Sequence, residues 1–222
     1  MAGIDVLDAD RHTCSMTRLH TERLVLRPFR GSDAHTFAQL AGEWGVASMT
    51  SDIPYPLSVE HARLWLKPAR GEVRFAVEHG GQLIGGAGFY RRASGSAELG
   101  FWFGAPWWGQ GFATEATRAV VAHGFYRHKV PMFTSAHFLD NPASRNVLVK
   151  LGFVAAAECR IACVSRGVDV AARTYWLDRP NAARAMPGLD QKPAALDRFK
   201  DLMGWLRRAL DRGKDTPSST SR

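Results

Sequence analysis

The feature that most constrains this chain is a pair of glycines one residue apart, followed at once by a helical pattern. Gly109 and Gly111 lie in the segment WWGQGFATEA at residues 107–116. Apolar residues then recur every three or four positions as far as Phe125, which predicts a packed helix. Residues 97–103, just upstream, are rich in aromatic side chains and are predicted to form a strand. A helix N-terminus after a glycine turn offers unpaired backbone N–H groups and a positive dipole end, which favours anion binding.

By itself a Gly-x-Gly turn is equally consistent with a plain tight turn, and no Lys-Ser/Thr pair follows Gly111 to make a Walker loop. The segment does closely resemble the pyrophosphate loop of the GNAT acetyltransferase superfamily, which usually reads Arg/Gln-x-x-Gly-x-Gly/Ala. A basic or amide residue is common where this chain has a tryptophan, so the backbone amides would make most of the contacts with the pyrophosphate. The resemblance implies that acetyl-CoA, the acyl donor, is bound by Trp108, Gly109, Gln110, Gly111, Phe112, Ala113 and Thr114.

The order of the predicted elements supports the same fold class. Strands are predicted at residues 21–29, 73–78, 83–90, 97–103, 132–138, 153–158 and 170–177, and helices at 33–40, 58–66, 112–128 and 142–151. Ser58 is predicted to cap the second helix, and Gly152 to end the last one. Leu24 and Leu26 are predicted to face inward in the first strand, and Arg23, Val25 and Arg27 outward. Several antiparallel hairpins precede one βαβ unit, which gives an α+β fold with a mixed, mostly antiparallel twisted sheet and flanking helices. This order also resembles the GNAT fold, over residues 18–178.

A second informative stretch is NPASRNVLVKLGF at residues 141–153. It resembles the GNAT segment in which an Asn begins a helix beside the cofactor. Many members carry a tyrosine seven residues after that Asn to protonate the leaving thiolate, but here the position is Leu148. Ser144 matches the branch typified by the ribosomal-protein N-terminal acetyltransferases, where a serine is the proposed acid. The resemblance implies that Asn141 contacts the cofactor and Ser144 is catalytic, whereas local chemistry alone would make both residues helix caps.

Acetyl transfer to an amine needs a neutral nucleophile, and a lysine amine has a pKa of about 10.4 and an N-terminal amine about 8. A general base therefore helps. Glu98 is the candidate, because its AELGFW context resembles that of the family; a surface carboxylate is the alternative. By the same resemblance, a backbone N–H near Trp102 or Phe103 would stabilise the oxyanion where the strand splays and binds the pantetheine arm.

The resemblance implies direct attack of the amine on the thioester, with a peptide or protein N-terminus as the acceptor. Three alternatives remain open: a small-molecule amine such as an antibiotic, polyamine or amino acid; a non-catalytic acyl-CoA-binding module; and a nucleic-acid-binding or ribosome-binding protein. Trp44, Met49, Tyr55 and Trp107 are candidates for an acceptor pocket, although each is also consistent with ordinary core. Phe89, Tyr90 and Phe101 are assigned to the core.

Composition sets the remaining bounds. A chain of 222 residues with 45% apolar residues and a net charge of +8 is expected to form one globular domain with appendages. Three cysteines, without further Cys or His at ligand spacing, predict a reducing compartment and no metal site. The first residues contain no apolar run, and we expect a cytoplasmic protein without a signal peptide or membrane span.

The two ends are predicted to lie outside the domain at residues 18–178. Residues 1–17 are expected to be a flexible extension. Residues 179–222 are expected to form a basic extension with an amphipathic helix at 193–210 and a disordered Ser/Thr-rich tail. Residues 181–222 hold nine Lys/Arg against five Asp/Glu. This helix is consistent with docking on the domain, with a homodimer contact, or with a membrane or ribosome contact.

Overall fold

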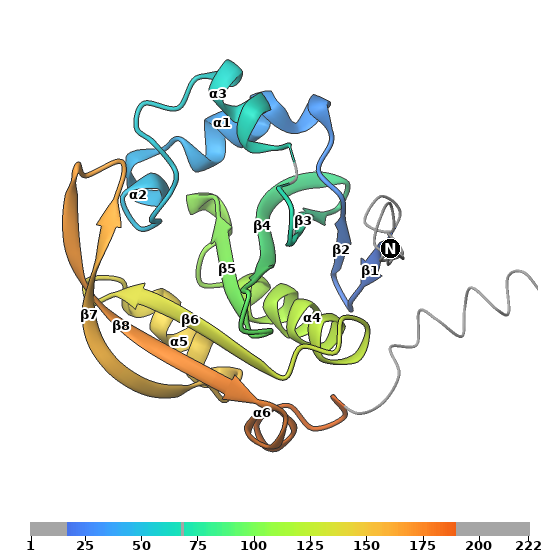
Figure 1. The fold of residues 1–222 in the computed structure, drawn as a ribbon. Helices are drawn as coiled ribbons and strands as arrows, with labels where there is room; N and C mark the ends of the chain where they lie inside the picture. Colours follow the sequence, from blue (N-terminus) through green and yellow to red (C-terminus); the bar gives the residue numbers. More distant parts are fainter. Residues whose placement is uncertain (1–16, 68, 190–222) are drawn as a thin grey trace, which may run out of the picture. The chain divides into compact units, whose positions relative to one another are not determined.

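The protein is described by a computed structural model, which covers residues 17–67 and 69–189 (Figure 1). An eight-stranded sheet runs in the order β1-β2-β3-β4-β5-β6-β8-β7. Only β5 and β6 are parallel neighbours in this sheet, and the other pairs are antiparallel. The predicted α+β fold with a mixed, mostly antiparallel sheet is confirmed. The strands are β1 (Leu19–His20), β2 (Leu24–Arg27), β3 (Glu72–His79), β4 (Gln82–Arg91), β5 (Ala97–Phe103), β6 (Met132–Phe138), β7 (Val154–Cys163) and β8 (Val168–Asp178).

Helices cover both faces of the sheet. On one face α1 (Ala34–Ala41) and α3 (Val59–Trp65) pack around Trp102 of β5, with the short α2 (Trp44–Ala47) beside them. On the other face α4 (Phe112–Tyr126) lies against β4 and β5, and α5 (Pro142–Lys150) lies beside β6 (Figure 1). The last helix described is α6 (Arg179–Ala185), after β8. None of the helices within the described ranges is long and apolar enough to cross a membrane.

Local signals in the sequence account for most of these boundaries. The side chain of Ser58 accepts a hydrogen bond from the backbone N–H of His61 at 3.1 Å and so caps α3. Gly80 and Gly81 both have positive φ and form the two-residue turn between β3 and β4. Gly152 ends α5 with φ of 87°, as predicted for a helix-stop glycine.

Some expectations were wrong or incomplete. The predicted first strand over residues 21–29 is shorter, and β1, α2 and α6 were not predicted. The closing hairpin is longer than expected, because β7 reaches Cys163 and β8 begins at Val168. The predicted helix at 193–210 lies outside the described residues, as do residues 1–16.

Arg27 was predicted to face solvent, but its side chain is buried. Its guanidinium donates to both carboxylate oxygens of Asp33, at 2.7 and 2.8 Å, and to Glu78 Oε1 at 2.6 Å. The two carboxylates raise its pKa, with the hydrogen bond to Asp33 as the largest cause. Alternation alone could not predict this, because Glu78 comes from another strand. The network joins β2 and β3 to the start of α1.

The parallel pair in the centre of the sheet is very short. β5 and β6 pair only through Ala97–Phe133 and Glu98–Thr134 among the residues described. Beyond these pairs β5 stays with β4, and β6 stays with β8. The two parallel strands therefore diverge toward their C-terminal ends, and this gap positions the site.

Two histidines meet at the C-terminal end of α4. The Nε2 atoms of His123 and His128 are 3.1 Å apart, and the ring of Phe75 contacts His123 edge-on. Burial, followed by the nearby charges of His128 and Arg127, lowers the pKa of His123 to about 4. The folded protein therefore keeps His123 neutral at a pH where the unfolded chain already binds a proton.

This predicts acid sensitivity within a defined range. Stability from His123 is complete above its unfolded pKa of about 6.5, is lost as the pH falls toward 4, and changes no further below that. We expect a loss on the order of 1–2 kcal/mol, discounted because the ring is only partly buried. Urea unfolding between pH 7 and 4 would measure it. The change in the free energy of unfolding with pH should be smaller in His123→Leu. It should persist in His35→Leu, which changes an exposed histidine of α1. An unchanged pH dependence in His123→Leu would refute the assignment.

Candidate active site

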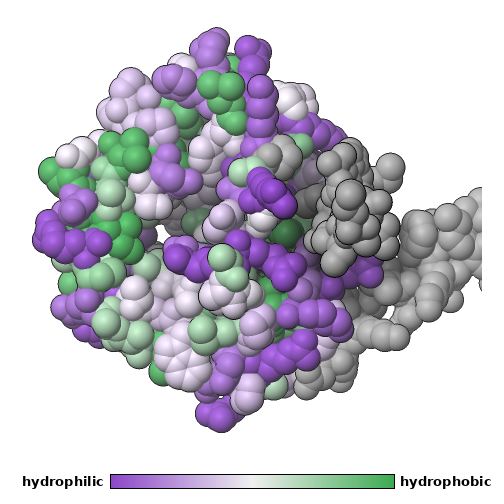
Figure 2. Space-filling view, viewed as in Figure 1, coloured by the Kyte–Doolittle hydropathy of each residue, from purple (hydrophilic) through white to green (hydrophobic). Residues whose placement is uncertain are grey.

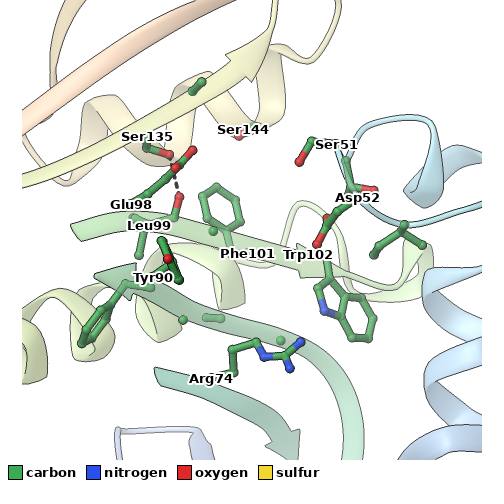
Figure 3. Close-up of a pocket in the computed structure, with 18 of the residues that line it drawn as sticks. Ser51, Asp52, Arg74, Tyr90, Glu98, Leu99, Phe101, Trp102, Ser135 and Ser144 are labelled. Carbon is green, nitrogen blue, oxygen red and sulfur yellow. Dashed lines mark hydrogen bonds between the residues drawn. The ribbon is translucent and has the colours of Figure 1, made fainter. Parts of the chain in front are cut away.

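A pocket of about 390 Å³ opens where β5 and β6 diverge. It is lined by β4, β5 and β6, by residues 49–53 of the loop after α2, and by Ser144 of α5 (Figure 3). In the space-filling view the surface is hollowed in this region, between β5, β6 and the α2 loop (Figure 2). The gap between β5 and β6 goes through the sheet and forms part of the pocket. The pocket therefore reaches both faces of the sheet.

The floor on the α1 and α3 side of the sheet is bare of side chains at its centre. Gly88 of β4 is the register partner of Gly100 of β5 and of Arg74 of β3, so these three residues share one row on this face. A Cβ on Gly100 would meet nothing within 4 Å. The rows on either side carry large side chains, Tyr90 with Glu98 and Trp102 opposite Gly86. We call this row, Arg74–Gly88–Gly100, the glycine trough.

The turn between β7 and β8 holds the pocket loop in place. Val164 N–H donates to the carbonyl of Ser51 at 3.0 Å. Arg166 donates to the carbonyl of Ser48 at 2.7 Å and to Asp140 Oδ2 at 2.6 Å, and its guanidinium lies over the ring of Phe138. The contacts with Ser48 and Ser51 join segments more than 100 residues apart, and they give residues 48–51 a fixed position over the pocket.

The glycine loop lies at the C-terminal end of β5, as predicted. Gly109 and Gly111 have φ of 73° and 82°, a region that side chains other than glycine rarely adopt. Gly111 is the N-cap of α4 and has no side chain to cover the first N–H groups of the helix. The indole of Trp108 donates to the carbonyl of Phe103 at 2.6 Å and is half exposed. The N-terminus of α4, whose first N–H groups have no side-chain cap, thus lies just beyond the C-terminal end of β5.

Arg23, the residue just before β2, stabilises this loop, a role that no sequence pattern indicated. Its backbone N–H and Nε donate to Glu115 at 2.9 and 2.7 Å, and Nη1 donates to the carbonyl of Gln110 at 3.1 Å. Its guanidinium also lies 4.4 Å from the centre of the Phe112 ring. Burial alone would raise the pKa of Glu115, but the hydrogen bonds from Thr21 and Arg23 hold it below its usual value. Glu115 is therefore ionised, and Arg23 balances its charge at the start of α4.

Glu98 lies at the point where β5 and β6 separate. It pairs with Thr134 in the parallel ladder, and its side chain lines the pocket. The carboxylate forms an ion pair with Arg92, and both side chains are about half exposed, at 44% and 52%. Exposed pairs of this kind contribute little free energy, so Arg92 does not prevent the carboxylate from turning to a substrate.

Asn141 and Ser144 begin α5, and the local capping role is present. Asn141 Oδ1 accepts from the backbone N–H of Ser144 at 3.0 Å. This bond uses the main chain of Ser144 and leaves its hydroxyl out of the cap. Ser144 also lines the pocket (Figure 3). The two expectations for these residues are therefore compatible.

The backbone N–H groups of Trp102 and Phe103, the two candidate oxyanion donors, point to opposite sides of β5. The Leu99 carbonyl accepts from Ser135 of β6 at 3.0 Å, and the Gly104 N–H donates to Ile84 of β4. Because backbone groups alternate along a strand, the N–H of Phe103 faces the gap and that of Trp102 faces β4. The indole of Trp102 is buried with the α1 and α3 cluster.

The four residues predicted as candidates for the acceptor pocket lie in different places. Met49 lines the pocket, but Trp44 and Tyr55 contact each other edge to face, outside the pocket lining, and are about half exposed. Trp107 contacts His79 and Phe112 beside the glycine loop. The assignment of Tyr90 to the core was wrong, since this residue is 48% exposed and lines the pocket. Two pocket residues that the sequence did not indicate are Arg74 and Ser135.

Comparison with known proteins gives the class to which this fold and site belong. Residues 23–154 match the Acetyltransferase (GNAT) domain family. The chain belongs to this family, and it is an N-acetyltransferase that uses acetyl-CoA.

Individual relatives are more distant. An uncharacterized N-acetyltransferase, YoaA of Bacillus subtilis, is 28% identical over 73% of this chain and 97% of its own. The fold is similar to that of Mycobacterium smegmatis RimJ in complex with CoA-disulfide, with a TM-score of 0.64 and 19% identity over 73% of this chain and 87% of that one. It is equally similar to RimL, the ribosomal L7/L12 alpha-N-protein acetyltransferase, in complex with coenzyme A, with a TM-score of 0.64 and 18% identity over 73% of this chain and 98% of that one.

The cap geometry predicts that the two roles at the start of α5 can be separated. We expect Ser144→Ala to lower kcat roughly 10²-fold without changing Tm, because the cap uses the Ser144 N–H and not the hydroxyl. Asn141→Ala should lower the free energy of unfolding by about 1 kcal/mol. Ser58→Ala is a matched control that removes the cap of α3, outside the pocket, and should cost similar stability without lowering kcat. Full activity in Ser144→Ala would exclude the hydroxyl from catalysis.

Proposed function

We propose that this protein transfers the acetyl group of acetyl-CoA to the N-terminal amine of a peptide or protein. The observation that carries the proposal is the position of the pocket, which passes through the gap between β5 and β6 and lies beside the glycine loop. The donor's pyrophosphate would bind the backbone N–H groups of residues 109–114, before and at the start of α4, since the Trp108 N–H already donates to the Ala105 carbonyl. Its pantetheine arm would lie in the gap, along the backbone of β5, with Asn141 on the opposite side.

The chemistry follows from groups around the gap. The amine nitrogen attacks the thioester carbonyl while its proton passes to Glu98, directly or through water. The Phe103 N–H faces the gap and is the candidate donor to the oxyanion. The C–S bond then breaks, and Ser144 donates a proton to the leaving thiolate. The acetyl group goes to the acceptor without a covalent enzyme intermediate.

Charge and relatives support an amine acceptor of this kind. The pocket lining carries three carboxylates, Asp52, Glu72 and Glu98, against the single guanidinium of Arg74. This surplus attracts a cationic amine. An N-terminal amine, with a pKa of about 8, loses its proton more readily than a lysine amine. The fold is shared with RimL, whose name states alpha-N-protein acetylation. The same charge also favours a small cationic amine as the second candidate.

Acetyl-CoA binding tests the donor site. We expect calorimetric titration to show binding by the wild type and none by Gly111→Trp, because a bulky side chain at positive φ would distort the loop and cover the N–H groups. Gly95→Ala is the matched control, since Gly95 also has positive φ and open space but lies in the β4–β5 turn, at the other end of β5. Equal binding by Gly111→Trp would place the donor elsewhere.

The role of Glu98 makes a separate prediction. Glu98→Gln keeps the size and the hydrogen-bonding capacity of the side chain but removes the base, so kcat should fall about 10²–10⁴-fold while acetyl-CoA binding stays unchanged. Steady-state kinetics on a peptide acceptor, with calorimetry on the same preparation, would measure both. Arg92→Gln removes only the ion-pair partner and should retain kcat within a few-fold. A kcat within threefold of wild type in Glu98→Gln would rule out Glu98 as the base.

A further inference from the structure

Arg74 lies at the end of the glycine trough that is farthest from the gap. Its side chain crosses the place where Gly88 lacks one, since a Cβ on Gly88 would be 3.1 Å from Arg74 Cγ. The guanidinium stacks on the ring of Trp65 at 4.3 Å and points toward the side on which Trp102 lies (Figure 3). Arg74 is therefore held in a defined direction along the pocket floor.

The hydrogen bonds of Arg74 are only partly used. Nε pairs with Glu72 at 3.0 Å, and Nη2 donates to the carbonyl of Lys67 at 2.7 Å. Neither of these contacts involves Nη1, the outer nitrogen of the guanidinium that is left for a ligand. Burial lowers the pKa of Arg74, although the charges of Glu72 and Asp52 both act to raise it. The loss of hydration therefore outweighs the stabilisation that these two carboxylates give the cation.

A second donor without a partner lies on the same face. Within the described part of the chain, Trp102 Nε1 is buried and makes no hydrogen bond. It lies directly over Gly86, whose Cβ, if present, would be 2.6 Å away. A buried N–H left unpaired costs about 1–3 kcal/mol, so this end of the trough is short of hydrogen-bond acceptors.

Local charge decides which acceptor group fits. Glu72 already forms an ion pair with Arg74, and Asp52 lies close enough to affect its pKa. A further carboxylate would be repelled by both side chains. A neutral carbonyl oxygen can accept from Nη1 without that repulsion. The distance also suits a peptide, since the trough spans one to two strand spacings, roughly 5–10 Å, between Arg74 and the gap.

We propose that Arg74 Nη1 binds a main-chain carbonyl oxygen of the acceptor, so that the enzyme selects peptides and other amide-bearing amines over plain alkylamines. This inference rests on the proposed acetyltransferase function and specifies its acceptor. The amine would lie at the gap beside Glu98, and the following one or two residues would lie over Gly100, with a carbonyl toward Arg74, whose side chain lies across Gly88. Arg74 is a specificity residue in this arrangement and takes no part in proton transfer.

The test compares a tripeptide with two analogues in which a trans-alkene replaces the first or the second peptide bond. This keeps the shape and removes one carbonyl. We expect one analogue to lose about ten- to a hundred-fold in kcat/KM with the wild type, the loss expected for a hydrogen bond to a charged group. In Arg74→Met that difference should fall to within about twofold. The wild-type comparison stands even if this variant folds poorly, which acetyl-CoA calorimetry would reveal.

Arg63→Met is the matched control, because it removes an exposed arginine of α3 that does not line the pocket. It should keep the full difference between peptide and analogue. Equal kcat/KM for the peptide and both analogues would overturn the inference while leaving peptide acetylation intact. A tenfold preference for Ser-Asp over Ser-Asn peptides that Arg74→Met abolishes would overturn it in favour of a carboxylate site. Acetylation of alkylamines but of no peptide would overturn both this inference and the proposed acceptor.

Discussion

The site depends on a parallel strand pair that is only two residues long. A longer β5–β6 ladder would pair the backbone of both strands and close the sheet, as every other neighbouring pair does. Because pairing stops at Glu98–Thr134, the next backbone groups of β5 face a gap in the middle of the sheet. Buried backbone donors and acceptors need partners, so a gap of this kind favours a ligand that supplies them. The same divergence brings the ends of two strands, and the loops that follow them, to opposite sides of one pocket.

Those two loops are stabilised differently. The glycine loop is held by an ion pair between Arg23, just before β2, and Glu115 of α4, which are 92 residues apart. Side-chain hydrogen bonds to Gln110 and the contact with Phe112 extend this pairing into the loop itself. At the start of α5 the support is local, through the cap that Asn141 provides. A substitution at Arg23 would therefore disturb the glycine loop, which is distant in the sequence. A substitution at Asn141 would instead destabilise α5, the helix that this residue caps.

These differences explain how far the sequence could predict the structure. The limits of β5 and β6, the Ser58 cap and the Gly152 stop depend on neighbours within a few residues, and the predictions for them are confirmed. Arg27 and Tyr90 were assigned to the wrong environment because alternation along one strand cannot show what another strand contributes. No motif or pattern in the sequence indicated a role for Arg74. Its importance comes from lying opposite Gly88, and that register exists only once β3 and β4 have paired.

The two faces of the sheet then account for a division between donor and acceptor. On the α4 side, the proposed donor site would use backbone N–H groups next to glycines, so the side chain at position 108 need not bind the donor. On the α1 and α3 side, the floor is open at Gly100, and the Arg74 side chain lies across Gly88. Arg74 is at one end of the trough, and Glu98, of opposite charge, is in the row beside Gly100. In the arrangement that we propose, the acceptor has an amine at the Glu98 end and an oxygen at the Arg74 end. A polyamine has the first and lacks the second, while a peptide N-terminus has both.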